Sequence, residues 1–247
     1  MDFTTIQIGI EKNVARIALN RPEVRNAMNA QMIRELTEAV KWLDSRDDIM
    51  VIEICGNGKC FCAGADLNYM KEMANAGYEE NAADARRLAN LFKTIYFCNK
   101  AVISLVHGAC VGGGNGITAA SDIVLAEKET KFAFPEVKIG LTPATISPFV
   151  IAKCGETAAH DLMLSGRRFS AQEAFNFKLV NFVGTMDEIN ERLNFYIKEF
   201  LEVKPMALRN CKMLLRTVAH RDDPNDPVFE KTAQAIAIQR TMMSSER

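Results

Sequence analysis

Residues 100–116 read KAVISLVHGACVGGGNG, an apolar run that leads directly into a cluster of glycines. The first part, Lys100–Val106, has the composition of a buried strand, and Ile117–Ala120 behind the cluster is an alanine-rich helical stretch. A strand, a glycine loop and a helix in this order are also the context of phosphate-binding loops. The stretch therefore predicts an α/β protein with a loop at a strand end that is a candidate for function.

The glycine cluster fails both common nucleotide-binding patterns. A P-loop needs Lys after its last glycine, and no Lys follows here. The dinucleotide fingerprint fails as well, because Gly112 and Gly114 are followed by Ile117 in place of a third glycine. What remains is bare backbone at a helix N-terminus, whose free N–H groups suit an oxygen that carries negative charge. The alternative is a tight packing turn, and the cluster alone does not decide between the two.

A second loop of small residues follows the strand predicted at Met50–Cys55. It reads FCAGADL over Phe61–Leu67 and ends before a helical turn. Two loops of this kind can each direct one N–H group at the same carbonyl oxygen. Together they predict an oxyanion hole built from main-chain amides.

The rest of the chain alternates strands and helices in its first half and is helical in its second. We expect strands at Thr5–Ile10, Val14–Leu19, Met50–Cys55, Lys100–Val106, Ser121–Ala126 and Lys131–Phe134, and helices at Ala30–Leu43 and Ala82–Phe97. From Ile146 to Arg216 the pattern is helical, with breaks near Gly155, at Gly166 and around Val203–Pro205, and a last helix is expected at Val228–Met243. The alternation indicates βαβ units around a sheet, followed by a helical appendage.

The composition excludes several classes of protein. The 247 residues carry 30 basic and 31 acidic side chains, so bulk charge predicts no nucleic-acid partner. No apolar run reaches the roughly 18 residues of a transmembrane helix and no secretory signal is visible, so no membrane partner is expected. The seven cysteines are odd in number and scattered in spacing, which indicates free thiols in a cytoplasmic protein. The three histidines show no metal-binding spacing, so no metal site is predicted.

A series of motifs resembles the enoyl-CoA hydratase/isomerase family, also called the crotonase family. They are RPEVRNAMN at 21–29, FCAGADL at 61–67, HGACVGGGNG at 107–116, SDIVLA at 121–126, FAFPEVKIGLTP at 132–143 and SGRRFSAQEAFNFKLV at 165–180. GADLNYMKEMA and IGLTPATISPFV are most similar to the methylglutaconyl-CoA hydratase branch of leucine breakdown. The resemblance implies an α/β fold, a crotonase-like spiral of ββα units over 1–190, with a C-terminal helical trimerisation region over 191–247. It also implies an acyl-CoA substrate, no separate cofactor, and a homotrimer or a dimer of trimers.

The same resemblance assigns the site residues. Ala65 and Gly113 would supply the two N–H groups of the oxyanion hole, and Glu136 of the PE motif would carry the catalytic proton. A partly desolvated carboxyl group has a raised pKa, which suits proton exchange near neutral pH. The substrate-binding residues implied by motif position are Val24, Arg25, Ala63, Asp66, Leu67, Gly112 and Gly116. For Asp66, a helix cap is a further expectation.

Gly116 departs from the family pattern, because family hydratases carry a second glutamate in a GGGxE motif and this chain reads GGGNG. Three hypotheses follow. The chain is a hydratase in which another polar group, such as Asn115, helps to place the water, or it is a Δ3,Δ2-enoyl-CoA isomerase, which needs only one carboxylate. The third hypothesis is a non-catalytic acyl-CoA-binding subunit. Glycine is expected to open space for a 3-branched acyl chain, which favours the hydratase. A 3-methylglutaconyl chain is branched in this way and also ends in a carboxylate. Candidates for binding that carboxylate are Lys71, Lys138 and Tyr69.

Overall fold

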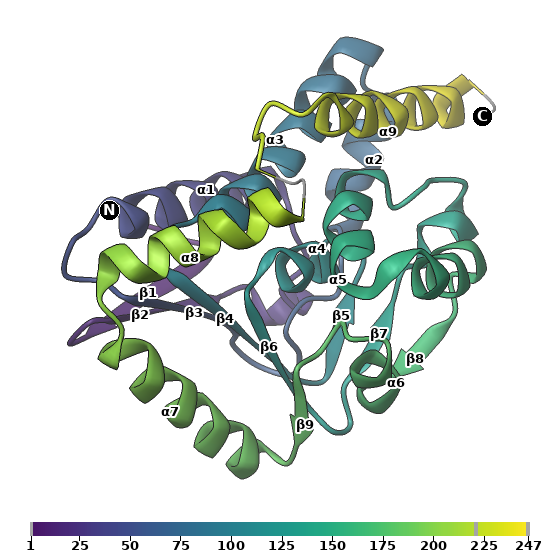
Figure 1. Cartoon of the computed structure of the whole chain (residues 1–247). Coiled ribbons are helices and arrows are strands. Elements are labelled where there is room, and N and C mark those ends of the chain that lie inside the picture. The colour runs from purple at the N-terminus through teal and green to yellow at the C-terminus, as the bar shows by residue number, and fades with distance from the viewer. Residues whose placement is uncertain (1, 220–221, 246–247) are drawn as a thin grey trace.

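The computed structural model describes residues 2–219 and 222–245, which form two sheets covered by helices (Figure 1). The strands are β1 (Ile6–Glu11), β2 (Val14–Leu19), β3 (Val51–Gly56), β4 (Ala101–Val106), β5 (Ala109–Val111), β6 (Ile123–Glu127), β7 (Lys131–Ala133), β8 (Arg168–Ser170) and β9 (Phe182–Gly184). The larger sheet has the order β1-β2-β3-β4-β6-β9 and the smaller one β5-β7-β8. Only the β1–β2 pair is antiparallel among the described strands of the larger sheet.

Helices surround these sheets and extend beyond them at the C-terminal end. They are α1 (Ala30–Asp44), α2 (Leu67–Asn75), α3 (Tyr78–Phe97), α4 (Gly113–Ala120), α5 (Ser147–Ala159), α6 (Ala171–Asn176), α7 (Met186–Glu202), α8 (Pro205–Val218) and α9 (Pro227–Ser245). Short turns are η1 (Pro22–Val24), η2 (Pro135–Ile139) and η3 (Ala144–Ile146), which are 3-10, and η4 (His160–Leu164), which is π-helical. No helix within the described residues is long and apolar enough to cross a membrane.

The larger sheet is buried on both faces, as expected for parallel strands. Along β4, Val102 and Val106 belong to the core shared with α1, α3, α4 and α5, whereas Ala101, Ile103 and Leu105 belong to the core on the other face. That second core includes Ile189 and Leu193 of α7, which lies across the sheet from α1 (Figure 1). The alternation follows from the two-residue period of a strand.

Most predicted elements of the first half are present. The strands predicted at Thr5–Ile10, Val14–Leu19 and Lys100–Val106 correspond to β1, β2 and β4, and the helix predicted at Ala30–Leu43 corresponds to α1. The N-terminus of α1 is capped by the side chain of Asn29, which accepts a hydrogen bond from Met32 N at 2.9 Å. The mixed α/β fold class is confirmed.

Two predictions about the chain's organisation need correction. The segment from Ile146 to Arg216 is not helical throughout, because it contains the three-residue strands β8 and β9. Both strands are held by partners far away in the sequence: β8 pairs with β7, and β9 with β6. In addition, α4 begins at Gly113 and not at Ile117, so the last glycines of the cluster form its first turn.

The C-terminal helices are connected to the core in different ways. The predicted boundary between residues 190 and 191 falls inside α7, which packs on the sheet. Helix α9 returns to α3 (Figure 1), where Arg86 pairs with Glu230 at 2.8 Å, and Thr142 N donates a hydrogen bond to Gln239 Oε1 at 2.8 Å. Ile236 of α9 is buried beside Leu141 and Ala85. The last helix therefore forms part of the same body as the sheets.

Candidate active site

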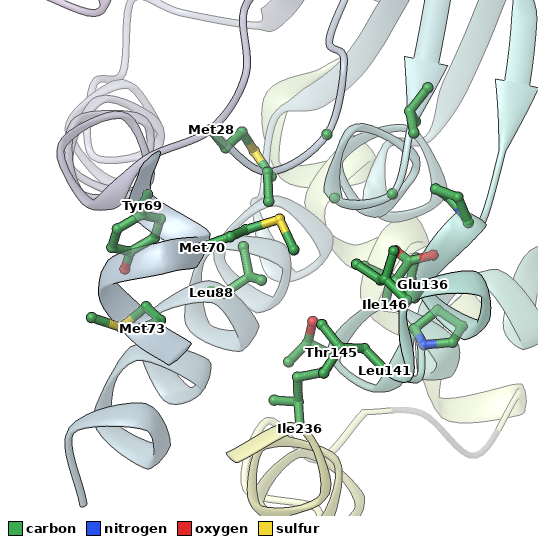
Figure 2. Close-up of a pocket in the computed structure, with 18 of the residues that line it drawn as sticks. Met28, Tyr69, Met70, Met73, Leu88, Glu136, Leu141, Thr145, Ile146 and Ile236 are labelled. Carbon is green, nitrogen blue, oxygen red and sulfur yellow. The ribbon is translucent and has the colours of Figure 1, made fainter. Parts of the chain in front are cut away.

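The two predicted loops meet at a cavity of about 240 Å³ (Figure 2). Its walls come from the loop before α2, the start of α4, the turns η2 and η3, and the helices α2, α3 and α9. The lining includes Ala65, Gly113 and Glu136, the three predicted catalytic residues. Apolar side chains such as Met70, Leu88 and Ile146 form most of the remaining surface (Figure 2).

The loop that carries Ala65 is fixed by backbone pairing on two sides. On one side Cys62 N donates to Ala109 O and Val111 N donates to Cys62 O, both at 3.0 Å, which joins the loop to β5. On the other side Met28 N donates to Gly64 O at 2.8 Å. These bonds hold Ala65 beside the start of α4 without using its own N–H group, for which the described residues provide no acceptor.

Gly113 is the first residue of α4, so its N–H group is one of the four that a helix cannot satisfy internally. The described part of the chain offers this amide no acceptor either. Only glycine fits here without movement, because a Cβ atom at position 113 would lie 2.2 Å from Cε of Met28. Ala65 and Gly113, whose amides have no acceptor among the described residues, therefore line one cavity.

Glu136 contributes a carboxyl group to the same cavity. It lies in the turn η2, where Pro135 fixes the first position of the turn. Its Oε2 atom is buried and has no hydrogen-bond partner among residues 2–219 and 222–245. Burial disfavours the charged form and raises the pKa of Glu136 from 4.5 to about 7. Such a carboxyl group exists in both protonation states near neutral pH, which is what general acid–base catalysis requires.

Comparison with known proteins agrees with this geometry. The family model described as Enoyl-CoA hydratase/isomerase matches residues 9–244. The chain belongs to the enoyl-CoA hydratase/isomerase family. It is 31% identical over 230 residues to the enoyl-CoA hydratase AKT6-1 of Alternaria alternata, which covers 92% of this chain and 74% of that protein.

Solved structures of enoyl-CoA hydratases share the fold. One from Shewanella pealeana superposes with a TM-score of 0.86 at 31% identity, over 99% of this chain and 91% of that one. Another, from Bacillus halodurans, has a TM-score of 0.90 at 22% identity, over 98% of each chain, and this likeness concerns the fold alone. The crotonase-like architecture predicted for this chain is thus confirmed.

The space expected beside Gly116 does not exist in this member of the enoyl-CoA hydratase/isomerase family. A Cβ atom at position 116 would lie 2.5 Å from Cε1 and Cζ of Phe92 and 2.6 Å from Cγ2 of Ile146. Gly116 is itself buried and does not line the cavity. The prediction that glycine at 116 opens room for a branched acyl chain is therefore wrong. The assignment of Gly116 to substrate binding stays a prediction. Phe92 and Ile146 occupy the place where a side chain would have pointed.

Asn115 cannot place a catalytic water from its position in the structure. Its side chain is fully buried, and its Nδ2 atom donates to Cys110 O at 3.2 Å and to Ala133 O at 2.8 Å. These bonds connect the side chain to β5 and β7, and Asn115 does not line the cavity. Asn115 is therefore a structural residue that holds the small sheet together.

The predicted substrate-binding residues fall into two groups. Ala63, Leu67 and Gly112 line the cavity, whereas Val24, Arg25 and Asp66 lie outside it. Arg25 O accepts a hydrogen bond from Ala63 N at 3.0 Å, so the backbone of Arg25 supports the loop.

Asp66 serves as a helix cap, as one of the sequence expectations had it. Its side chain accepts hydrogen bonds from Asn68 N and Tyr69 N at the start of α2. It also pairs with Arg21 at 2.8 Å. These partners give Asp66 a role in holding the loop, and its assignment to substrate binding stays a prediction.

The three residues proposed for an acyl carboxylate are placed differently. Lys71 and Lys138 are exposed and do not line the cavity. Tyr69 lines it, but its hydroxyl group donates to Asp84, a buried residue of α3. The cation that the cavity does contain is Arg240 of α9, whose Nη1 donates to Asp84 Oδ2 at 2.6 Å.

The sequence analysis missed Arg240, although a signal was present. Ala233, Ile236 and Ala237 form the buried stripe of α9, and Arg240 continues that stripe at helical spacing. An arginine on the buried side of a helix points to a specific partner. Among the described residues, no group of three His, Cys, Asp or Glu side chains could hold a metal ion.

Proposed function

We propose that this member of the enoyl-CoA hydratase/isomerase family adds water to, or removes it from, a 2-enoyl-CoA thioester, with Glu136 as its proton carrier. The observation that carries the proposal is the buried, unpaired Oε2 atom of Glu136, in a cavity that Ala65 and Gly113 also line. The names of the relatives, which are enoyl-CoA hydratases, support the same reaction.

The chemistry requires a group that accepts negative charge and a group that moves a proton. When a proton leaves the α-carbon, or a nucleophile adds at the β-carbon, charge moves to the thioester oxygen. The N–H groups of Ala65 and Gly113 stabilise that oxygen most when its charge is greatest, and losing one such donor costs about 3–4 kcal/mol in the barrier. Glu136 gives a proton to the α-carbon or takes one from it.

Among the described residues, Asp84 is the second carboxylate that lines the cavity. Its hydrogen-bond partners make it unsuitable for proton transfer. Its two oxygens accept from Tyr69, from Arg240 at 2.6 Å and from Arg87 at 3.4 Å. Glu136 thus works without a second carboxylate.

A Δ3,Δ2-enoyl-CoA isomerase is the second candidate. The packing of Phe92 and Ile146 around Gly116, and the burial of Asn115, favour it because they remove the predicted partners for a catalytic water. Moving a double bond needs one group that takes a proton from one carbon and returns it to another. A single carboxyl group of the kind that Glu136 provides suffices for that.

A panel of thioesters distinguishes the candidates. The chain is incubated with crotonyl-CoA, 3-methylglutaconyl-CoA, 3-hydroxy-3-methylglutaryl-CoA and 3-hexenoyl-CoA, and the products are weighed by mass spectrometry. Gain or loss of water supports the hydratase, and a product of unchanged mass with a moved double bond supports the isomerase. No turnover of any thioester contradicts both and favours a non-catalytic acyl-CoA-binding subunit. We propose 3-methylglutaconyl-CoA as the substrate, as in leucine degradation, on the likeness of the 64–74 and 139–150 motifs.

We further propose that the chain works as a cytoplasmic homotrimer or dimer of trimers and needs no cofactor besides the CoA of its substrate. Support for the assembly comes from α8, whose exposed large apolar side chains are Met206, Met213, Leu214, Leu215 and Val218. Such a surface is typical of a protein–protein contact. Sedimentation equilibrium tests the assembly: three or six copies support it, and a monomer at micromolar concentration contradicts it.

A further inference from the structure

Among the described residues, one arginine lines the largely apolar cavity. Arg240 lines the cavity from α9, and its side chain is 15% exposed. Within the described residues it has one acceptor, Asp84 Oδ2, which takes a hydrogen bond from Nη1. A guanidinium group has five N–H donors, so most of those of Arg240 are available to a ligand.

Asp84 positions Arg240, but its single negative charge does not neutralise both arginines that contact it. The buried carboxylate binds Arg240 on one oxygen and the hydroxyl group of Tyr69 on the other. Arg87 approaches Asp84 as well, at 3.4 Å, with a half-exposed side chain. Arg87 and Arg240 both face this one carboxylate, so the group of Asp84, Arg87 and Arg240 carries one more positive charge than negative.

The ion pair of Asp84 and Arg240 lies away from the predicted proton carrier. In Figure 2, Tyr69 and Glu136 are on opposite sides of the cavity, with Met70, Leu88 and Ile146 between them. Because Tyr69 and Arg240 share Asp84, the cation belongs to the side of Tyr69. An acyl chain that starts at the oxyanion-hole amides and crosses the apolar middle would bring its far end to Arg240.

The geometry points to an acyl chain that ends in a carboxylate, which Arg240 binds. This inference rests on the proposed function and assigns the residue that recognises the far end of the substrate. A methyl group at the same place would leave the guanidinium donors facing hydrocarbon, which is unfavourable. A carboxylate would satisfy them with charge-assisted hydrogen bonds, in the geometry that arginine favours. Sites built around such a bond reject the analogue that lacks it.

The test compares two six-carbon 2-enoyl-CoA substrates, one ending in a methyl group and one in a carboxylate. We expect the wild type to have the higher kcat/KM for the carboxylate-ended substrate. The ratio to measure is kcat/KM for the carboxylate-ended substrate divided by kcat/KM for the methyl-ended one. The substitution Arg240→Gln lowers this ratio by about tenfold or more, since a hydrogen bond to a charged group is lost. The double variant Arg240→Gln with Asp84→Asn, which removes the charge of the carboxylate that Arg240 binds, shows the same fall.

Arg86→Gln is the matched control. Arg86 also ties α3 to α9, through Glu230, but it does not line the cavity. The ratio therefore stays at the wild-type value if the effect of Arg240 is on the ligand and not on the docking of α9. Equal losses on both substrates in the Arg240 variants overturn the inference, since that result indicates a structural ion pair or a contact to CoA.

Two further outcomes separate this inference from the proposed function. A wild type that converts neither substrate contradicts the proposed function. A wild type that converts the methyl-ended substrate better contradicts only the carboxylate assignment. A measurement that needs no variant is competition by saturated six-carbon acyl-CoAs: the carboxylate-ended one inhibits about tenfold more tightly, and equal inhibition overturns the inference.

Discussion

The carboxyl group of Glu136 rests against the backbone of Gly112, since a Cβ atom at position 112 would lie 3.0 Å from Glu136 Oε1. Gly112 has φ 50° and ψ −119°, a conformation that side chains other than glycine rarely adopt. The same residue leads into α4, whose first N–H group lines the cavity. Gly112 thus helps to position both the carboxyl group of Glu136 and the amide of Gly113. A substitution at Gly112 is expected to change the distance between them.

Gly112→Ala is expected to lower turnover by about tenfold or more, because the methyl group displaces Glu136 and misplacement near 1 Å is costly. The backbone strain adds about 1–3 kcal/mol of lost stability. Steady-state kinetics and urea unfolding measure the two effects. Gly9→Ala is the control, since a Cβ atom at Gly9 has nothing within 4 Å. Wild-type turnover by Gly112→Ala would show that the contact with Glu136 has no catalytic importance.

The pKa of Glu136 predicts a pH-dependent stability. Its folded value of about 7 lies above the ordinary 4.5, so the stabilisation of the protonated form is complete below about pH 4.5 and is lost as the pH rises through 7. At about 1.36 kcal/mol per pH unit, the shift corresponds to a change on the order of 3 kcal/mol. Glu136→Gln lacks this contribution.

Urea unfolding of wild type and Glu136→Gln at pH 5 and pH 8 measures it. The variant gains stability relative to the wild type at the higher pH, because it carries no buried charge there. The difference in unfolding free energy between the wild type and the variant cancels the contributions of all other titrating groups. A difference that is the same at both pH values contradicts the raised pKa.

Gly116→Glu is not expected to restore a second catalytic glutamate. Its Cβ would lie within 2.6 Å of both Phe92 and Ile146, and overpacking of a core costs about 1–3 kcal/mol. We predict a lower urea midpoint and no gain in water addition. Gly9→Glu, on the exposed edge strand β1, is the control for the added charge. A stable Gly116→Glu variant with faster hydration would show that the site around position 116 is open.

The oxyanion-hole assignment is tested by removing one donor. Proline at position 113 deletes the N–H group and suits the first residue of a helix, provided that Met28→Ala makes room for the ring. The matched control, Gly113→Ala with Met28→Ala, keeps the amide. We expect turnover by the proline variant to be about 10²–10³-fold below that of the alanine variant. Equal turnover by the two variants excludes the Gly113 amide from the mechanism.

The sequence predicted the framework of the fold better than the surroundings of the site. Elements such as Val14–Leu19 and Ala30–Leu43 carry their own periodicity, so they were found from local pattern. Strands β8 and β9 have three residues each and exist because distant strands pair with them. Pairing between strands that are distant in the sequence leaves no pattern in the residues of the short strand itself.

The environment of the site depends on long-range packing. Phe92 and Ile146 reach Gly116 from α3 and η3, so the sequence around Gly116 could not reveal that the space is filled. Arg240 comes from the last helix to a cavity whose loops lie far earlier in the chain. By contrast, Ala65, Gly113 and Glu136 each follow a strand or an extended piece, where the motif itself marks the position. Their convergence on one cavity agrees with the sequence prediction.

Hydrogen–deuterium exchange at the α-carbon of butyryl-CoA tests the central claim, that Glu136 moves a proton at that carbon. The thioester is incubated with the protein in D₂O and followed by NMR. We predict that the wild type and Glu129→Gln, an exposed control outside the cavity, incorporate deuterium, and that Glu136→Gln does so at least about 10²-fold more slowly. Exchange by folded Glu136→Gln at the wild-type rate would contradict the account.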